Sequence, residues 1–203
     1  MALIAHYKLD GNALDSVGNN HGTANNVTWV DGKLGQAGSF DGSNDTIFSN
    51  IKKTSNTISV SLWFKKTAVS TTQAIWTQRW WNRHSRGITI NNNNQLAAFS
   101  RNESRTWQSS NFFSVNANEF YHVVFTQEKD IVTFYVNSVL IDSFAMGSFL
   151  ENYTDYHVLG KHTDSVYYFD GLIDDVRIYD HALSLKEVQE LAKAKVLHYN
   201  FND

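Results

Sequence analysis

The chain has 203 residues and a net charge of −3, and 42% of its residues are hydrophobic and 14% aromatic. That length suits one domain, and this composition is too apolar and too aromatic for a disordered chain. The sequence has no apolar run long enough to cross a bilayer. Its charges are interspersed, which argues against nucleic acid and anionic membranes as partners. Without cysteine, it excludes disulfides, thiolate metal sites and thiol catalysis.

The N-terminal half alternates apolar stretches with turn-rich segments. Residues 3–9 are predicted to form a first strand, which leads into a run at 10–22 that is dense in glycine, asparagine and aspartate. Short strands are predicted at 36–40 and 46–48. The stretch 58–64 alternates apolar residues with serines and Trp63, a pattern typical of a half-buried strand with Trp63 on the other face.

The second half continues with short strands. Those at 74–77 and 87–90 flank a loop at 78–86 that is unusually aromatic and basic. Asn137 and Ser138 are the two residues between the strands predicted at 131–136 and 139–144. This two-residue connection suits a tight hairpin, because asparagine tolerates a positive φ angle. The remaining strands are predicted at 96–100, 106–108, 120–126, 131–136, 139–144 and 156–160.

The last predicted strand carries two adjacent aspartates. Asp174 falls in the same alternating phase as Leu172 and Val176, so its carboxylate is predicted to point toward the core. A buried carboxylate is costly unless it is neutralised, accepts hydrogen bonds or meets a cation. Asp175 falls in the opposite phase and is predicted to face outward.

A short helix is predicted to close the domain. Ser184 is followed three residues later by Glu187, which indicates a capping box. Apolar residues then recur at helical spacing, at Leu185, Val188, Leu191 and Ala192. The predicted domain covers residues 1–195. Residues 196–203 echo the start of the chain and are predicted to be a tail or the beginning of a following module.

Strands at short, regular intervals with one terminal helix predict an all-β fold, an antiparallel two-sheet sandwich or jelly roll. Four segments, at 7–16, 19–23, 35–45 and 169–184, resemble in order and spacing the laminin-G-like jelly roll of the concanavalin A-like lectin/glucanase superfamily. The resemblance spans nearly the whole chain and implies that the first and last strands pair. That fold hosts lectins, binding modules, adhesins, virion proteins and glucanases, so it says less about function.

Aspartates in the turns and the last strand supply the hard oxygen ligands that Ca²⁺ takes. If the first and last strands pair, as the resemblance implies, Asp10 and Asp174 approach one another. Alternatively, these aspartates cap turns through bonds to their own backbone. The predicted ligands of a structural Ca²⁺ are Asp10, Asp15, Asp41, Asp45 and Asp174.

A second candidate site lies in the aromatic and basic loop. Sugars stack their apolar faces on aromatic rings, while planar donors such as arginine hold polar groups, so this mixture suits a glycan. Alternatively, one tryptophan packs in the core and the other marks a subunit contact. The predicted ligand-binding residues are Arg79, Trp80, Trp81, Arg83, His84, Arg86 and Trp107, with Trp63 as a further candidate.

The sequence predicts no catalytic site. A glycosidase needs two carboxyls that face each other across the scissile bond, and the glucanases of this superfamily carry them as a Glu-x-Asp pair on one strand. The chain has no such run, and its eight histidines lack a metalloprotease spacing. Asp174 and Asp175, on opposite faces, cannot serve as the pair.

We therefore predict a non-catalytic carbohydrate-recognition or adhesion module that binds a cell-surface glycan. Residues 1–5 lack the features of a secretory signal peptide, so we expect that the protein leaves the cell by another route or that the sequence is a piece of a longer chain. The predicted setting is extracellular or virion-associated, such as the host-binding part of a phage. The alternative is a structural virion or protein–protein interaction domain, bound to other subunits of a larger assembly and to no glycan. A glucanase is a third hypothesis.

Overall fold

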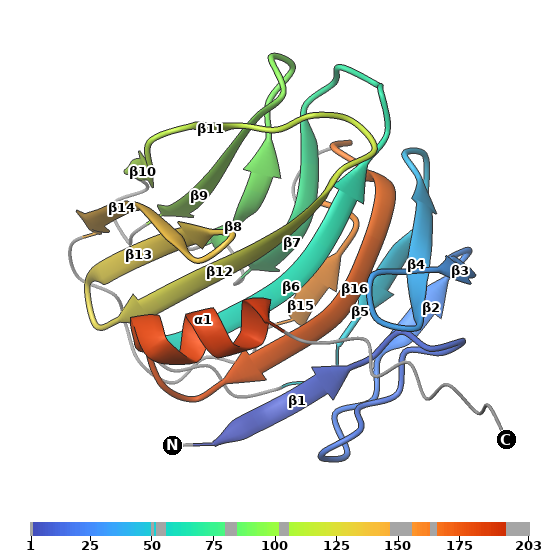
Figure 1. Cartoon of the computed structure of the whole chain (residues 1–203), viewed down its shortest axis with the longest axis horizontal. Coiled ribbons are helices and arrows are strands. Elements are labelled where there is room, and N and C mark those ends of the chain that lie inside the picture. Colours follow the sequence, from blue (N-terminus) through green and yellow to red (C-terminus); the bar gives the residue numbers. More distant parts are fainter. Residues whose placement is uncertain are drawn as a thin grey trace, which may run out of the picture.

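The computed structural model describes residues 2–49, 51, 56–79, 85–101, 106–146, 156–162 and 166–193. Its strands form two antiparallel sheets packed face to face, and a short helix lies on the outer side of one sheet (Figure 1). This arrangement confirms the predicted all-β sandwich with one C-terminal helix.

Sheet A runs in the order β14 (Val139–Ala145), β13 (Ile131–Val136), β12 (Phe120–Glu128), β6 (Thr57–Lys66), β16 (Asp170–Tyr179), β4 (Gln36–Asp41) and β3 (Thr28–Asp31). The first strand, β1 (Leu3–Tyr7), also pairs with β16, which confirms the expected pairing of the first and last strands. Sheet B runs in the order β10 (Trp107–Ser109), β9 (Gln95–Arg101), β8 (Ser85–Ile90), β7 (Gln73–Arg79), β15 (Tyr156–Leu159), β5 (Thr46–Phe48) and β2 (Thr23–Asn25), and β11 (Phe113–Ser114) also pairs with β9.

Every strand that the sequence predicts is present, with small differences at the ends. Asn137 and Ser138 in the hairpin turn have φ angles of 49° and 66°, as the predicted tight turn requires. The strands β2, β3 and β11 were not predicted. They are three, four and two residues long, too short to establish an alternating pattern.

One hydrophobic core fills the space between the sheets. Trp76 of sheet B packs against Phe125 of sheet A with ring centroids 5.3 Å apart. Phe169 packs against Phe40 and Phe64 at 6.2 and 6.3 Å. Because protein interiors are close-packed, these large rings set the separation of the two sheets.

A polar link crosses this core at Arg86. The side chain is only 2% exposed, and its guanidinium donates hydrogen bonds to Gln78 at 2.6 Å and to Gln127 at 2.8 Å. Gln78 lies on β7 of sheet B and Gln127 on β12 of sheet A, so Arg86 ties the two sheets together. This corrects the prediction that Arg86 belongs to the ligand-binding loop. The strand β8 begins at Ser85, and Arg86 shares the inward phase of Ile88.

His157 of β15 is also buried in the core and accepts a hydrogen bond at Nδ1 from the indole of Trp76, at 3.2 Å. Burial and the charge of Arg86 lower the pKa of His157 to about 3. The imidazole is therefore neutral at physiological pH, which allows its nitrogen to accept that hydrogen bond.

A β-bulge divides β16 into two halves. The register against β6 shifts between Asp174 and Arg177, and Asp175 has a φ angle of 48°. Ile173 and Val176 both lie in the core, whereas Leu172 is only partly buried. The single alternating phase predicted for this strand is therefore wrong, because the bulge adds a residue and switches the faces.

Asp174 and Asp175 are consequently both buried, with exposures of 0% and 6%. The burial predicted for Asp174 is confirmed, but its predicted direction toward the core is wrong, because Asp174 pairs with Trp63 on the outer face of sheet A and lies under the turn between β3 and β4. The exposure expected for Asp175 is also wrong. Asp175 Oδ1 lies 2.6 Å from Nε2 of His6 and 3.1 Å from the guanidinium of Arg177. These contacts link β1 to the second half of β16.

The helix α1 (Leu185–Ala192) begins with the predicted capping box, in which Ser184 and Glu187 exchange hydrogen bonds. It lies in front of sheet A (Figure 1) and packs Val188 against Leu183 and Val124 of β12. Leu185 is 48% exposed, so it does not belong to the buried face that its spacing suggested. In the described part of the chain, no helix is long and apolar enough to span a bilayer. Residues 196–203 lie outside the described part.

We expect Arg86→Ala to lower the free energy of unfolding by about 2–4 kcal/mol, because the substitution leaves a cavity and removes donors from two buried glutamines. Chemical denaturation measures this loss. Lys186→Ala, at an exposed position of α1, is the control and should change stability little. Equal midpoints for the two variants would contradict a structural role for Arg86.

Candidate functional site

The aspartates predicted to bind calcium are spread over several turns, where each accepts backbone N–H groups. Asp15 binds three of them, from His6, Val17 and Asn20. Asp41 accepts from Ser43 at 2.8 Å, and Asp45 accepts from Asp41 at 2.8 Å. These are the turn-capping bonds of the alternative interpretation.

Asp10 and Asp174 act on one turn, between β3 and β4. Asp174 Oδ2 accepts from the backbone N–H groups of Lys33 at 2.7 Å and Leu34 at 2.8 Å, and Asp10 accepts from Gln36 at 2.7 Å. Gly32 makes this approach possible, because a Cβ there would lie 2.6 Å from Asp174 Oδ2.

These aspartates do not fit a shared calcium site. Backbone N–H groups present partial positive charge to Asp10 and Asp174, where a cation would otherwise stand. Among the residues that the structure describes, no three histidine, aspartate or glutamate side chains lie close enough to hold a metal ion. The calcium ion stays a prediction.

Four residues of the predicted ligand-binding loop, Trp80, Trp81, Arg83 and His84, lie outside the described residues. Arg79 ends β7, and its backbone is described. Trp63 lies on sheet A, is 6% exposed and has Lys33 Nζ 4.8 Å above its ring, so it does not join Trp107 of sheet B.

The strand register places Arg79 and Trp107 in one row across the end of sheet B. Arg79 pairs with Ser85, Ser85 with Arg101, and Arg101 with Trp107. The described ends of the predicted loop therefore lie in the same row as Trp107, with β9 between them and β10.

Trp107 belongs to a group of side chains on the outer side of sheet B, which we call the outer aromatic cluster: Phe99, Arg101, Trp107, His162 and Tyr167. The Trp107 ring lies 5.0 Å from Phe99 and 6.3 Å from His162. The guanidinium of Arg101 lies 5.4 Å from its centroid. His162 in turn lies 5.7 Å from Phe99 and 6.2 Å from Tyr167.

The segment after β15 builds this cluster by crossing the sheet. Thr77 Oγ1 on β7 donates to the carbonyl of Lys161 at 2.9 Å, and the next residue, His162, stacks on Phe99 of β9. His162 N–H donates to the carbonyl of Tyr167 at 3.1 Å, which places Tyr167 beside it. Gly87 on β8 leaves room, because a Cβ there would lie 2.8 Å from the Phe99 ring.

The cluster offers the groups that hold a sugar. Trp107 is 50% exposed and Tyr167 is 43% exposed, whereas Phe99 and His162 are buried and support them. An exposed ring provides an apolar stacking surface, and a guanidinium such as that of Arg101, which lies over the Trp107 ring, is a group with planar donors for hydroxyl or carboxylate groups. Of these five residues, only Trp107 was predicted from the sequence.

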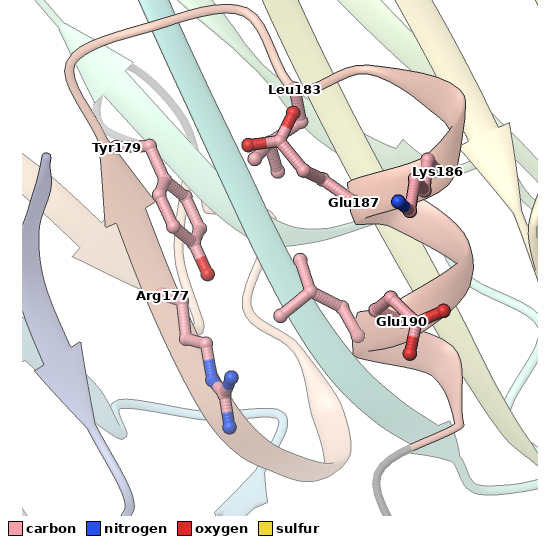
Figure 2. A pocket seen from close by; sticks show the side chains of 7 residues that line it. Arg177, Tyr179, Leu183, Lys186, Glu187 and Glu190 are labelled. Atoms are coloured by element: carbon pink, nitrogen blue, oxygen red, sulfur yellow. The ribbon is translucent and has the colours of Figure 1, made fainter. Parts of the chain in front are cut away.

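A groove of about 490 Å³ lies on the opposite side of the molecule, between β16 and α1 (Figure 2). Its lining residues are Arg177, Tyr179, Leu183, Lys186, Glu187, Glu190 and Leu191. Most of its charges are already engaged. Arg177 binds Asp175, Glu187 binds the Ser184 cap, and Glu190 pairs with Lys193 at 3.0 Å. This groove is therefore a weaker candidate than the outer aromatic cluster.

Comparison with known families gives a match over most of the chain. A family model described as "Concanavalin A-like lectin/glucanases superfamily" matches residues 40–189. Comparison with curated proteins finds no match.

Solved structures with the same fold include domain 4 of AbnA, a GH43 extracellular arabinanase from Geobacillus stearothermophilus, in complex with arabinotriose. It is 26% identical, with a TM-score of 0.81, and the alignment covers 94% of this chain and 98% of that domain. The ligand-binding domain of botulinum neurotoxin serotype D, in complex with N-acetylneuraminic acid, is 19% identical with a TM-score of 0.76. That alignment covers 96% of this chain and 51% of the toxin domain. A pentraxin from Limulus polyphemus is 14% identical with a TM-score of 0.65, over 78% and 82% of the two chains.

We expect the stability of the protein to depend on the protonation of Asp174. Burial raises its pKa to about 6 from the ordinary value of 3.8, although the N–H groups of Leu34 and Lys33 oppose the rise. The folded state therefore favours the protonated acid. The resulting stabilisation is complete below the ordinary pKa and is lost as the pH rises through about 6.

Asp174→Asn keeps an oxygen for the two N–H groups and cannot ionise. The wild type loses stability between about pH 4 and pH 7 and this variant does not, so the free energy of unfolding of the variant minus that of the wild type should rise by about 2 kcal/mol over this range. Asp174→Ala should be less stable than Asp174→Asn at every pH, because it leaves both N–H groups without that acceptor. Denaturant titrations across this range measure both effects, with Asp130→Asn in an exposed turn as the control. A constant difference between wild type and Asp174→Asn would contradict the shift.

Proposed function

The chain belongs to the concanavalin A-like lectin/glucanases superfamily, and we propose that it is a non-catalytic module that binds carbohydrate through the outer aromatic cluster. The observation that carries this proposal is the half-exposed ring of Trp107, which packs against the buried ring of Phe99 and has the guanidinium of Arg101 over it. A large aromatic surface held in place by buried neighbours binds a sugar face at low entropic cost.

The similarity to AbnA domain 4 supports this proposal. That domain is similar to the present chain over nearly its full length, and its structure holds arabinotriose. The neurotoxin domain shares the fold, and its structure contains N-acetylneuraminic acid. These two sugars differ in size and charge, so the ligand of this chain has to follow from its own residues.

The proposal assigns no catalysis to the chain. Glycoside hydrolysis uses two carboxyls that face each other across the bond. Four described carboxylates, Asp15, Asp45, Asp174 and Asp175, are buried. Each is engaged by hydrogen bonds from the protein or by an ion pair, which supports a structural use of these groups.

We place this module in an extracellular or virion-associated surface protein, such as the host-binding part of a phage, with a cell-surface glycan as its partner. The arabinanase whose domain 4 shares this fold is extracellular, which supports a setting outside the cell. The rival proposal is a contact between subunits of a larger assembly, since exposed tryptophan, tyrosine and arginine are also enriched at protein interfaces.

We expect a glycan array probed with the purified chain to give specific binding, and Trp107→Ala to lower the affinity for the bound glycan at least about tenfold. Thermal melting should show a folded variant, because Trp107 is half exposed. Phe112→Ala, at a residue 56% exposed, controls for the loss of a surface aromatic, and Lys186→Ala tests the groove beside α1. Loss of binding in Lys186→Ala alone would move the site to that groove. An array without any binding, together with self-association that Trp107→Ala abolishes, would favour the subunit contact.

A further inference from the structure

The two exposed rings of the outer aromatic cluster are not parallel. The planes of Trp107 and His162 meet at 29°, and those of His162 and Tyr167 meet at 72°. Because the rings of Trp107 and Tyr167 are tilted by such different angles from the plane of His162, these two rings cannot be parallel to each other. Trp107 and Tyr167 therefore form a corner with His162 between them, and each presents its surface in a different direction.

The corner is held by the backbone. Lys161 and Tyr168 form a β-bridge, and His162 donates its N–H to Tyr167 inside that bridge. The hydrogen bond from Thr77 to Lys161 fixes this segment to β7, and the buried ring of His162 fixes it to Phe99 of β9. Preorganised rings lose little conformational entropy on binding, so their orientation selects the shape of the ligand.

The flat face of a crystalline polysaccharide presents its sugar rings in one plane, and it would need coplanar aromatic rings to stack against. A soluble chain whose successive sugar units are rotated relative to one another presents its apolar faces in different directions. A single sugar is comparable in size to one aromatic ring and fills one side of the corner. The geometry of Trp107 and Tyr167 thus matches the soluble chain better than the crystalline face or the single sugar.

We propose that the outer aromatic cluster binds a soluble, non-planar oligosaccharide chain, with one sugar unit on Trp107 and a neighbouring unit on Tyr167. The guanidinium of Arg101 lies over the Trp107 ring, so the sugar unit stacks on the part of the ring that Arg101 leaves exposed. This inference rests on the proposed function and adds the class of glycan and the second contact residue.

The experiment combines two measurements on the full chain. The first is a glycan array with arabinan, xylan, mannan and β-glucan oligosaccharides, each as a series that starts from the single sugar, together with glycans that end in sialic acid. The second is sedimentation of the protein with microcrystalline cellulose and with chitin. Both are repeated with Trp107→Ala, Tyr167→Ala and Tyr167→Phe, and with Phe112→Ala as the exposed aromatic control.

We expect affinity to rise from the single sugar to a short chain in one of the series, and no sedimentation with the crystalline polymers. Tyr167→Ala should reduce the affinity for the chain about tenfold, toward that of the single sugar, and Tyr167→Phe should retain it because it keeps the ring. Trp107→Ala should reduce binding of both.

Three results would overturn the inference and leave the proposed function in place: equal affinity for single sugar and chain, chain binding that Tyr167→Ala does not change, or sedimentation with cellulose or chitin. In each of these, Trp107→Ala would still lower binding. The absence of binding to every glycan and polymer, or binding that Trp107→Ala leaves intact, would instead remove the proposed site and the inference together.

Discussion

The two buried carboxylates at the bulge of β16 hold the N-terminal part of the chain to the sheet. Asp174 fixes the turn between β3 and β4, and Asp175 pairs with His6 of β1 and with Arg177. A buried carboxylate is costly without such partners, so the bulge, β1 and the turn require one another. Because β16 also pairs with β4 and β6, this local requirement extends through sheet A.

Much of the fold could be predicted because its determinants are local. The apolar row of β6 that faces the core and the positive φ angles in the turn at Asn137 both follow from neighbouring residues. The strand is nevertheless buried on both faces and not half-buried as predicted, because other segments cover its outer face. The bulge does not, because the position where strand pairing shifts depends on the partner strand. That shift places Ile173 in the core and turns Asp174 to the outer face of sheet A, opposite to the predicted direction. Arg86 was misplaced for a smaller reason: the predicted strand began one residue after it, although its alternation with Ile88 was present in the sequence.

The candidate site was only partly predictable, since its parts are distant in sequence. Trp107 was identified by its aromatic character, whereas His162 and Tyr167 join it only because the chain after β15 crosses the outer side of sheet B. A signal was present in the aromatic run from Tyr167 to Phe169, which lies close after Gly160. That signal does not reveal which strand the segment crosses.

The hydrophobic core and the proposed recognition site lie on opposite sides of sheet B. Its inner side carries the core and the link through Arg86, while its outer side carries Trp107 and Tyr167 on a buried support. Exposed rings on a rigid support can change without disturbing the core beneath them. The same sandwich can thus present differently oriented rings to different sugars. This is a physical reason why a superfamily that shares one fold does not share one ligand.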